Sequence, residues 1–278
     1  MIVFLNGKFV PQEEATVSVF DRSFLYGDGL FESLRVTRGK PFRWWDHMER
    51  LRKGGDFLGI KIPFSCKMLE KFAAELIIRN QLPESLLRVT VSRGVGPRGY
   101  SPKDAATPTL VMSMHALPVS PTAGKAWNLH TASLRLPARE KLAQFKTANK
   151  LAQVLARAEA DLAGADEALM LNTDGFVVEG ASSNLFWVEG ETVCTPPLTS
   201  GILAGVTRAV TVELCQQLAL PFAERETTAQ RMRDAAGVFL TLSSFGVVEC
   251  GELDGVELAR SPLVKKLREA YDALLQRE

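Results

Sequence analysis

Several patterns of exported and membrane proteins are missing from this sequence. The first residues, MIVFLNGKFVPQEEATV, lack the basic start, long apolar stretch and small-residue cleavage site of a secretory signal. No apolar run reaches the ~18 residues that a membrane helix needs. We therefore expect a cytoplasmic protein that does not act on a membrane.

Cysteine and histidine are scarce and scattered. The four cysteines form no CxxC pair, and His47, His115 and His130 show no HxxxH or HxH spacing. Zinc sites and disulfide frameworks depend on such spacings, so we expect free thiols and no metal.

An excess of charge of either sign is also missing. Lys and Arg number 33 against 32 Asp and Glu, a net charge of +1, which leaves no global field to attract nucleic acid. The composition, 46% hydrophobic and 23% charged, is that of a globular protein with a sizeable core. A chain of 278 residues favours two modest domains.

The apolar periodicity predicts a mixed α/β fold. Short β-type runs alternate with turn residues between positions 2 and 40, as in an antiparallel sheet. Further strands are expected over residues 86–92, 109–115, 127–133, 167–172, 176–180, 183–190 and 237–243. Helices are expected over residues 44–60, 66–80, 148–162, 206–218 and 262–275.

A break in these patterns marks a domain boundary. Residues 117–124, LPVSPTAG, contain two prolines and a glycine that interrupt every periodicity. We predict an N-terminal α/β domain over 1–116, a linker over 117–124 and a C-terminal α/β domain over 125–278.

The loop over residues 94–99 matches GxGxxG but does not indicate a dinucleotide site. That fingerprint requires a helix to open at the loop, whereas Tyr-Ser-Pro follows here and continues as coil. The loop presents Arg93, Arg98 and Tyr100, which suit a carboxylate clamp because guanidinium binds carboxylate bidentately. A solvated surface loop is the alternative.

A second glycine-containing loop, residues 199–205, runs directly into a helical pattern. The free amides at that helix start favour a phosphate at Val206 and Thr207. The alternative is an ordinary helix cap in which Thr207 serves the backbone only. Ser182 and Ser183 lie in GASSN, which lacks the GxSxG elbow of serine hydrolases.

Taken in order, several segments resemble the class IV pyridoxal-phosphate aminotransferases, a family that includes D-amino-acid and branched-chain transaminases and aminodeoxychorismate lyase. They are DRSFLYGDGLFESLRV, HMERL, KTANKLAQVLARAEA, GADEALMLNTDGFVVEGASSNLFWV and GILAGVTR, and they span residues 21–208. The resemblance implies a two-domain fold-type IV enzyme with the cofactor, pyridoxal 5'-phosphate, in the interdomain cleft. It also implies a homodimer whose partner chain contributes to the site.

The resemblance assigns roles to residues that bind the cofactor. Lys146, on the C-terminal domain, would carry the cofactor as a Schiff base and then shuttle a proton, which requires an amine that can be neutral. Glu179 would keep the pyridine nitrogen protonated so that the ring accepts electrons. Arg50 would hold the phosphate.

Three further residues would complete the phosphate site in this resemblance. Val206 and Thr207 would supply amides and a hydroxyl, in agreement with the helix start noted above. Ser243, in LTLSS, aligns with another phosphate ligand, although the family's usual acidic, proline-containing continuation is replaced here by Phe-Gly-Val-Val-Glu.

The resemblance leaves two reactions on a small-molecule amino substrate open, and it favours aminodeoxychorismate lyase, which releases pyruvate and 4-aminobenzoate. Arg98 in SRGVGPRGYSP, Ser33 and Lys150 are similar to the lyase, and with Tyr26 the first two would bind substrate. EGASSNLF and FES are equally similar to D-amino-acid transaminases, so amino transfer to a 2-oxo acid remains the alternative. A cofactor-free scaffold is a further alternative, against which Lys146, Glu179 and Arg50 together argue.

Overall fold

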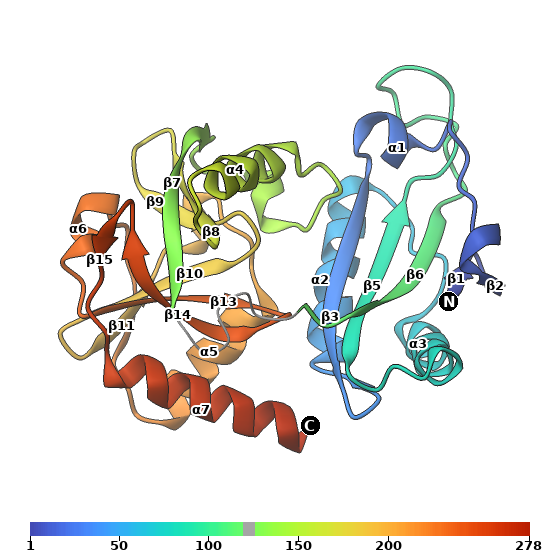
Figure 1. Cartoon of the computed structure of the whole chain (residues 1–278). Coiled ribbons are helices and arrows are strands. Elements are labelled where there is room, and N and C mark those ends of the chain that lie inside the picture. The colour runs from blue at the N-terminus through green and yellow to red at the C-terminus, as the bar shows by residue number, and fades with distance from the viewer. Residues whose placement is uncertain (119–125) are drawn as a thin grey trace. The chain divides into compact units, whose positions relative to one another are not determined.

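The computed structural model describes residues 1–118 and 126–278, and the chain divides into two compact units (Figure 1). The first unit contains Met1–Pro118, Phe145–Lys150 and Glu278, and the second contains Val119–Gln144 and Leu151–Arg277. Most of the predicted linker, 117–124, lies outside the described residues. None of the helices within the described ranges is long and apolar enough to cross a membrane.

The first unit is built on a six-stranded antiparallel sheet with the order β2-β1-β6-β5-β3-β4. Its strands are β1 (Ile2–Leu5), β2 (Lys8–Pro11), β3 (Gly29–Thr37), β4 (Lys40–Pro41), β5 (Ser85–Ser92) and β6 (Thr109–Ala116). The antiparallel pairing predicted for residues 2–40 is confirmed, and the later strands lie within one residue of the predicted ranges.

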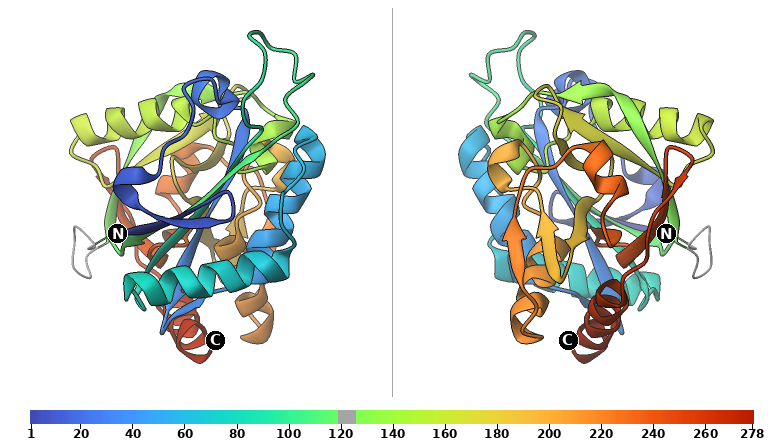
Figure 2. Two further views of the ribbon diagram at one scale, coloured as in Figure 1. Left: turned by 90° about the vertical axis from the view of Figure 1, so that its right-hand side faces the viewer. Right: turned by 90° about the vertical axis from the view of Figure 1, so that its left-hand side faces the viewer.

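Two helices, α2 (Trp44–Leu58) and α3 (Cys66–Asn80), cover one face of this sheet (Figure 2). Alternate strand residues, such as Leu34, Leu87 and Met114, point into a core shared with both helices. The Ser65 hydroxyl caps α3 by accepting the Met68 N–H. The opposite face of the sheet therefore carries the intervening, half-buried residues.

A short helix that we did not predict, α1 (Arg22–Tyr26), precedes β3, and a 3-10 turn, η1 (Gln12–Glu14), follows β2. Asp21 caps α1 by accepting the Ser23 N–H, and Gly27 ends it in the left-handed conformation. The helix has five residues and no apolar periodicity of its own, so its stability comes from the caps and from tertiary contacts.

The segment that carries Lys146 belongs to the first unit, whereas we predicted it in the C-terminal domain. Phe145 stacks on Phe57 of α2, and Thr147 forms a β-bridge with Leu30 of β3. These long-range contacts place residues 145–150 on the N-terminal sheet although they lie beyond the linker in sequence.

The second unit contains a nine-stranded mixed sheet with the order β12-β11-β10-β13-β14-β7-β8-β9, with β15 paired to β14. Its strands are β7 (Trp127–Leu136), β8 (Glu167–Asn172), β9 (Val177–Gly180), β10 (Asn184–Glu189), β11 (Thr192–Thr195), β12 (Phe222–Glu224), β13 (Gly237–Leu242), β14 (Gly246–Leu253) and β15 (Val256–Glu257). The pairing of Glu179 with Asn184 joins β9 back to β10, so this sheet closes on itself between β10 and β9.

Helical segments complete the second unit. They are η2 (Lys141–Gln144), α4 (Leu151–Leu162), η3 (Leu198–Ser200), α5 (Val206–Gln217), α6 (Ala229–Arg233) and α7 (Pro262–Arg277). On α4 the small residues Ala156 and Ala160 are buried in a cluster with Ala132 of β7 and Ala168 of β8, which lets the helix approach these strands closely. The predicted helices at 206–218 and 262–275 are confirmed within two residues.

Candidate active site

Lys146 lies beside the start of β3 because its own backbone pairs with that strand. The Phe31 N–H donates to the Lys146 carbonyl at 2.9 Å, and the Ala148 N–H donates to the Gly29 carbonyl at 2.8 Å. The Lys146 side chain is half-buried, and its Nζ lies 4.8 Å from the centroid of the Phe31 ring. A strand edge and an aromatic face thus locate this amine.

A buried carboxylate, Glu32, occupies the helix-covered face of the same strand. Its two oxygens accept hydrogen bonds from Arg50 Nε and Nη2, both at 2.7 Å, and one of them lies 2.7 Å from His47 Nδ1. Burial tends to raise the pKa of Glu32, but the charges and hydrogen bonds of Arg50 and His47 outweigh it and lower this pKa to about 2. Glu32 is therefore a carboxylate at every pH at which the chain is expected to work.

His47 is fully enclosed by the same cluster. Burial lowers the pKa of His47 below its ordinary value, although the Glu32 carboxylate acts in the opposite direction. The positive charges of Arg50 and Lys146 also act to lower it. At neutral pH the imidazole is accordingly uncharged.

The sequence identified Arg50 as a candidate site residue, but Glu32 and His47 were not predicted. In β3 the alternation places Leu30, Glu32 and Leu34 on the buried face, and a charged residue at a buried position of a strand is the signal that would have identified Glu32. Arg50 is held bidentately by this carboxylate. Its role as a phosphate ligand stays a prediction.

The other face of β3 carries a second cation that sequence reasoning missed, Arg88. Arg88 of β5 lies directly opposite Ser33 of β3, and its guanidinium carbon is 3.9 Å from the Phe31 ring centroid. Its Nε donates to Thr90 Oγ1 at 3.3 Å. Burial lowers the pKa of Arg88, and no carboxylate of the described residues lies within ion-pair distance.

The loop between β5 and β6 differs from the clamp that we predicted. Arg93 does not present its charge on the loop, because it is buried and donates to Asp28 at 2.7 Å and to the Leu58 carbonyl at 2.8 Å. Arg98 is exposed and has no carboxylate partner among residues 1–118 and 126–278. No helix opens after this loop, as the sequence predicts.

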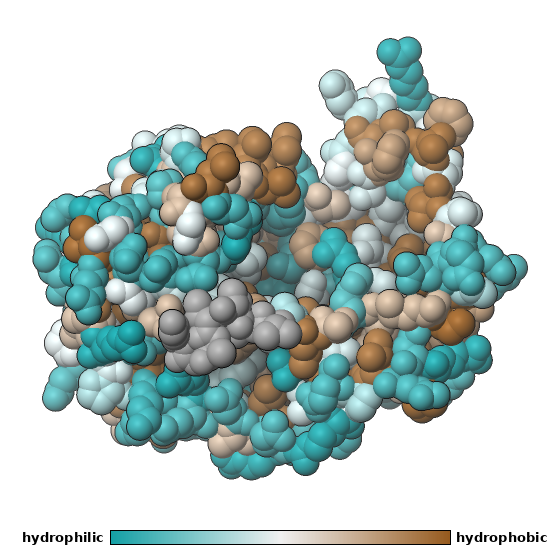
Figure 3. Space-filling view, in the orientation of Figure 1, coloured by the Kyte–Doolittle hydropathy of each residue, from teal (hydrophilic) through white to brown (hydrophobic). Residues whose placement is uncertain are grey.

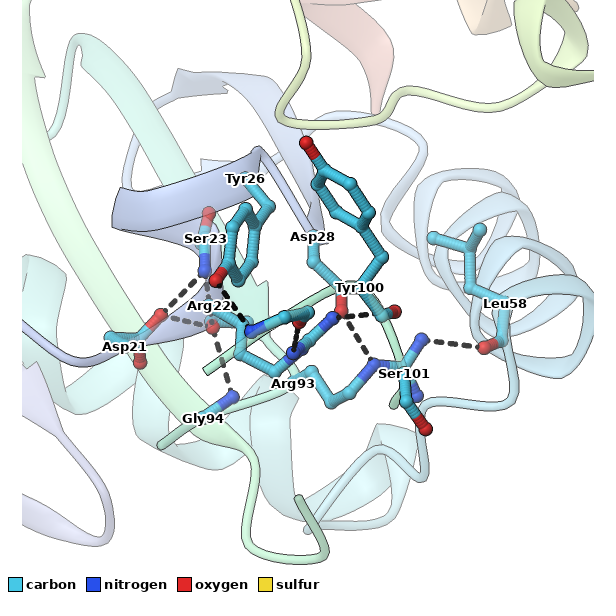
Figure 4. Close-up of polar contacts among 12 residues, drawn as sticks. Asp21, Arg22, Ser23, Tyr26, Asp28, Leu58, Arg93, Gly94, Tyr100 and Ser101 are labelled. Carbon is cyan, nitrogen blue, oxygen red and sulfur yellow. Dashed lines mark hydrogen bonds and ion pairs between the residues drawn. The ribbon is translucent and has the colours of Figure 1, made fainter. Parts of the chain in front are cut away.

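Tyr26, predicted to bind substrate, contacts the same loop. Its hydroxyl accepts the Gly99 N–H at 3.0 Å, and its ring packs edge-on against Tyr100 with centroids 5.6 Å apart (Figure 4). Of the three residues predicted to bind substrate, Arg98 lies on this loop and Tyr26 contacts it, while Ser33 lies beside Arg88.

In the second unit, Glu179 of β9 lies against the loop that precedes α5. It is 8% exposed, and its Oε2 accepts the Leu203 N–H at 3.0 Å. Asn184 of β10 holds the other side of that peptide segment, since its Nδ2 donates to the Leu203 carbonyl at 2.9 Å. The predicted ring-binding carboxylate and the predicted phosphate loop are therefore joined by hydrogen bonds.

The start of α5 is suited to an anion. Gly205 is the N-cap residue, and no side chain caps the helix, so Val206 and Thr207 occupy its first turn without a side-chain acceptor. A Cβ at Gly205 would lie 1.9 Å from Asn184 Oδ1, so a larger residue here would displace the Asn184 amide. Thr207 is not the cap residue, contrary to the helix-cap alternative. An uncapped helix start, a nearby hydroxyl and the buried Glu179 fit a phosphate and a protonated ring nitrogen.

The end of β13 carries the last predicted phosphate ligand. Ser243 is half-buried in the turn between β13 and β14. Two residues earlier, Thr241 is 2% exposed and its Oγ1 has no hydrogen-bond partner among the described residues. An unpaired buried hydroxyl is costly, so this strand end can accept a further polar partner.

Comparisons with known proteins identify the family of the chain. A family model described as amino-transferase class IV matches residues 29–253. A putative branched-chain-amino-acid aminotransferase of Methanocaldococcus jannaschii is 35% identical, over 98% of this chain and 95% of its own. A D-alanine aminotransferase of Bacillus licheniformis is 30% identical, over 97% of this chain and 95% of its own. A solved 4-amino-4-deoxychorismate lyase of Pseudomonas aeruginosa is 35% identical with a TM-score of 0.85, covering 96% of this chain and 97% of that chain.

Proposed function

Because the chain belongs to the class IV aminotransferase family and has the fold of these pyridoxal-phosphate enzymes, we propose that it binds pyridoxal 5'-phosphate and cleaves 4-amino-4-deoxychorismate to pyruvate and 4-aminobenzoate. One observation carries the choice of reaction. The unit that holds Lys146 also holds two guanidinium groups, Arg88 and Arg98, that lack a carboxylate partner among the described residues. The proposed substrate carries two carboxylates.

The residues of both units fit the cofactor, which supplies an aldehyde that captures an amino group and a ring that accepts electrons. Lys146 supplies the amine that would hold it covalently, and Glu179 supplies a carboxylate for the ring nitrogen. Val206 and Thr207 would bind the phosphate at the start of α5, with Arg50 and Ser243 as further ligands.

The roles of the chain's own groups follow from their surroundings. Lys146 Nζ, located over Phe31, would move a proton to and from the substrate carbon. Arg50 is kept in place by Glu32.

Two positive groups and a polar strand face suit an acidic substrate better than an aliphatic one. Ser33, Arg88 and Ser113 form one row across β3, β5 and β6, on the face opposite the core. Such a row would bind a carboxylate, whereas a branched aliphatic side chain would lie against the Arg88 charge without neutralising it, which costs binding energy.

A second candidate is an aminotransferase that uses a 2-oxo acid as acceptor. The M. jannaschii and B. licheniformis relatives, named as branched-chain and D-alanine enzymes, cover nearly the whole chain and support it. A dicarboxylic acceptor such as 2-oxoglutarate would also satisfy two guanidinium groups.

Two incubations separate these reactions. The purified holoenzyme is given 4-amino-4-deoxychorismate alone and, separately, D-alanine, L-leucine or (R)-phenylethylamine with 2-oxoglutarate. Pyruvate and 4-aminobenzoate released without any acceptor support the lyase. Amino exchange with no such release would replace it by the aminotransferase.

The same assay tests Arg88. Arg88→Met should raise KM for the proposed substrate by roughly 30-fold or more, since a charge-assisted hydrogen bond is lost in a half-buried site. Arg35→Met is the matched control, because Arg35 lies on the same face of β3 but is paired with Glu84 at 3.6 Å. An unchanged KM in Arg88→Met would remove the observation on which the lyase rests.

We further propose that the enzyme acts as a homodimer. Exposed apolar side chains gather over α1 and over α4, where they appear as hydrophobic surface (Figure 3). Near α1 the exposed residues include Phe20 at 65% and Phe24 at 74%, and on α4 they include Leu151 at 65% and Val154 at 59%. Apolar groups gathered in this way mark interaction surfaces.

A further inference from the structure

The loop between β5 and β6 carries the exposed Arg98 and is held by few backbone contacts. Its strand-like contact is a single β-bridge between Val95 and Asp21, supported by the Arg22 N–H donating to the Gly94 carbonyl at 2.9 Å. Long loops without secondary structure need other contacts to keep one conformation. Here those contacts come from side chains of α1 and of the residues just after it.

Arg22 supplies most of them from a buried position. It is 3% exposed, and its Nη1 and Nη2 donate to the carbonyls of Gly99 and Tyr100 at 2.8 and 3.1 Å (Figure 4). Its Nε donates to Asp28 Oδ2 at 2.8 Å. One guanidinium therefore binds two successive peptides of the loop while its charge is balanced by a carboxylate.

Asp28 connects this guanidinium to the rest of the unit. The same oxygen that accepts from Arg22 also accepts from Arg93 Nε at 2.7 Å. Arg93 in turn donates to the carbonyls of Leu58 and Gly59 at the end of α2. Burial tends to raise the pKa of Asp28, but the hydrogen bonds and charges of Arg93 and Arg22 outweigh it and lower this pKa. The loop is thus tied through two arginines to the end of a core helix.

Tyr26 holds the same loop from the other side of the Gly99 peptide. Its hydroxyl accepts the Gly99 N–H, whereas the Gly99 carbonyl accepts from Arg22. Gly99 has a φ of +111°, which glycine adopts without strain. Gly99, whose N–H and carbonyl are both hydrogen-bonded, directly follows Arg98. These contacts therefore set the direction in which the Arg98 side chain leaves the backbone.

We propose that Arg22 is a positioning residue, which with Asp28 and Tyr26 keeps the β5–β6 loop in the conformation that lets Arg98 bind the substrate carboxylate. This inference rests on the proposed function, in which Arg98 is a carboxylate ligand. It changes the role of Tyr26 from a substrate contact to a loop contact. Preorganisation of this kind lowers the entropy that binding would otherwise cost.

The test compares Arg22→Lys and Tyr26→Phe with Arg98→Gln. Lysine keeps the positive charge beside Asp28 but cannot donate to two successive carbonyls in a fixed plane. Arg52→Lys is the matched control, because Arg52 is also bound by carboxylates, Glu49 and Asp56, but lies away from the loop on the exposed side of α2. For each variant, KM and kcat are measured on whichever carboxylate substrate the wild type turns over, and hydrogen exchange is followed in peptides covering residues 96–104.

We expect Arg22→Lys to raise KM by about tenfold with kcat within about threefold of wild type, the pattern of lost substrate binding. The loop peptides should exchange about tenfold faster, since the Gly99 peptide loses a partner. Tyr26→Phe should show smaller changes of the same kind, and Arg52→Lys none. If Arg22→Lys does not fold, the KM and the loop hydrogen exchange of Tyr26→Phe decide whether the loop is positioned in this way.

Failures of the inference and of the proposed function differ. If Arg98→Gln raises KM while Arg22→Lys and Tyr26→Phe leave KM and loop exchange at wild-type values, the positioning role is overturned and the proposed function stands. If Arg98→Gln leaves KM unchanged, Arg98 is not a substrate ligand, and the positioning role is overturned even when exchange shows that Arg22 orders the loop. The proposed function is overturned only if the wild type releases no pyruvate and 4-aminobenzoate from 4-amino-4-deoxychorismate.

Discussion

At the scale of single residues, the buried charge of Glu32 should have a large effect on the stability of the first unit. Its carboxylate is buried with two hydrogen-bonded partners on α2, Arg50 and His47. Removing one partner of such a pair leaves the other charge buried and uncompensated, which costs more than the pair contributes. The stability of the unit should therefore respond both to substitution and to pH at this carboxylate.

Glu32→Gln should lower the free energy of unfolding at pH 7 by roughly 3 kcal/mol, because Arg50 loses its counter-charge. In the wild type the pKa of Glu32 falls from 4.5 to about 2 on folding. A depressed carboxyl pKa stabilises the fold above the unfolded value, so this contribution, about 3 kcal/mol, should be lost as pH falls from 4.5 toward 2. Urea unfolding of both proteins at a series of pH values measures it. Parallel pH profiles for the two proteins would contradict the assignment.

Lys146 is the residue on which the chemistry depends. Lys146→Ala should reduce turnover by at least roughly a thousandfold, because the group that exchanges protons and holds the cofactor is gone. Borohydride reduction of wild-type holoenzyme followed by peptide mapping should find the cofactor on Lys146. Lys141→Ala, at an exposed lysine of η2 close in sequence, should keep both the adduct and the activity. An adduct on another side chain would refute the proposed site.

At the scale of elements, the start of α5 depends on a close approach between Gly205 and Asn184. Gly205→Ala would place a Cβ against Asn184 Oδ1, so the loop or the amide must move. We expect the dissociation constant for pyridoxal 5'-phosphate to rise by about tenfold, since the phosphate amides lose their alignment. The double variant Gly205→Ala, Asn184→Ala removes the clash and separates steric displacement from other effects. Fluorescence titration of the apo-protein measures the constant, and an unchanged value in Gly205→Ala would show that this helix start is not the phosphate site.

Elements with their own periodicity could be predicted from the sequence, and those made by distant contacts could not. The helix at 66–80 has a serine cap and an apolar face, and its predicted range matches α3. The helix expected from 148 begins at Leu151, because Thr147 and Ala148 pair with β3 instead. Local patterns contain no information on that pairing, which also moved Lys146 to the first unit.

The residues of the candidate site also divide into those that a local pattern predicts and those that depend on distant contacts. The start of α5 was predicted from a glycine loop that runs into a helical pattern, and the structure leaves it uncapped. Arg93 was expected on the loop with Arg98, but its burial beside Asp28 depends on residues 65 positions away in sequence. Charge type alone does not distinguish an arginine that binds substrate from one that binds its own chain.

At the scale of the whole molecule, exposed apolar side chains are grouped over α1 and over α4, as expected of surfaces that another chain covers. On α4, Ala156 and Ala160 face the core while Leu151, Val154 and Leu155 are exposed, so this helix also carries an apolar strip on its exposed side. Exposed apolar strips of this kind mark interaction surfaces. A second copy of the chain is the simplest partner that can cover the strip on α4.

Charged substitutions on these surfaces should therefore produce monomers. The wild type should elute in light-scattering chromatography at about twice the 30.5 kDa of one chain. Val154→Asp on α4 and Phe24→Asp on α1 each place a charge on an exposed apolar position and should shift the mass toward one chain, because burying an unpaired carboxylate costs several kcal/mol. Ile78→Asp, at a residue of α3 that is 70% exposed outside both surfaces, is the control and should leave the mass unchanged. A wild-type mass of a single chain, or dimers that persist in both variants, would show that these surfaces do not join two copies.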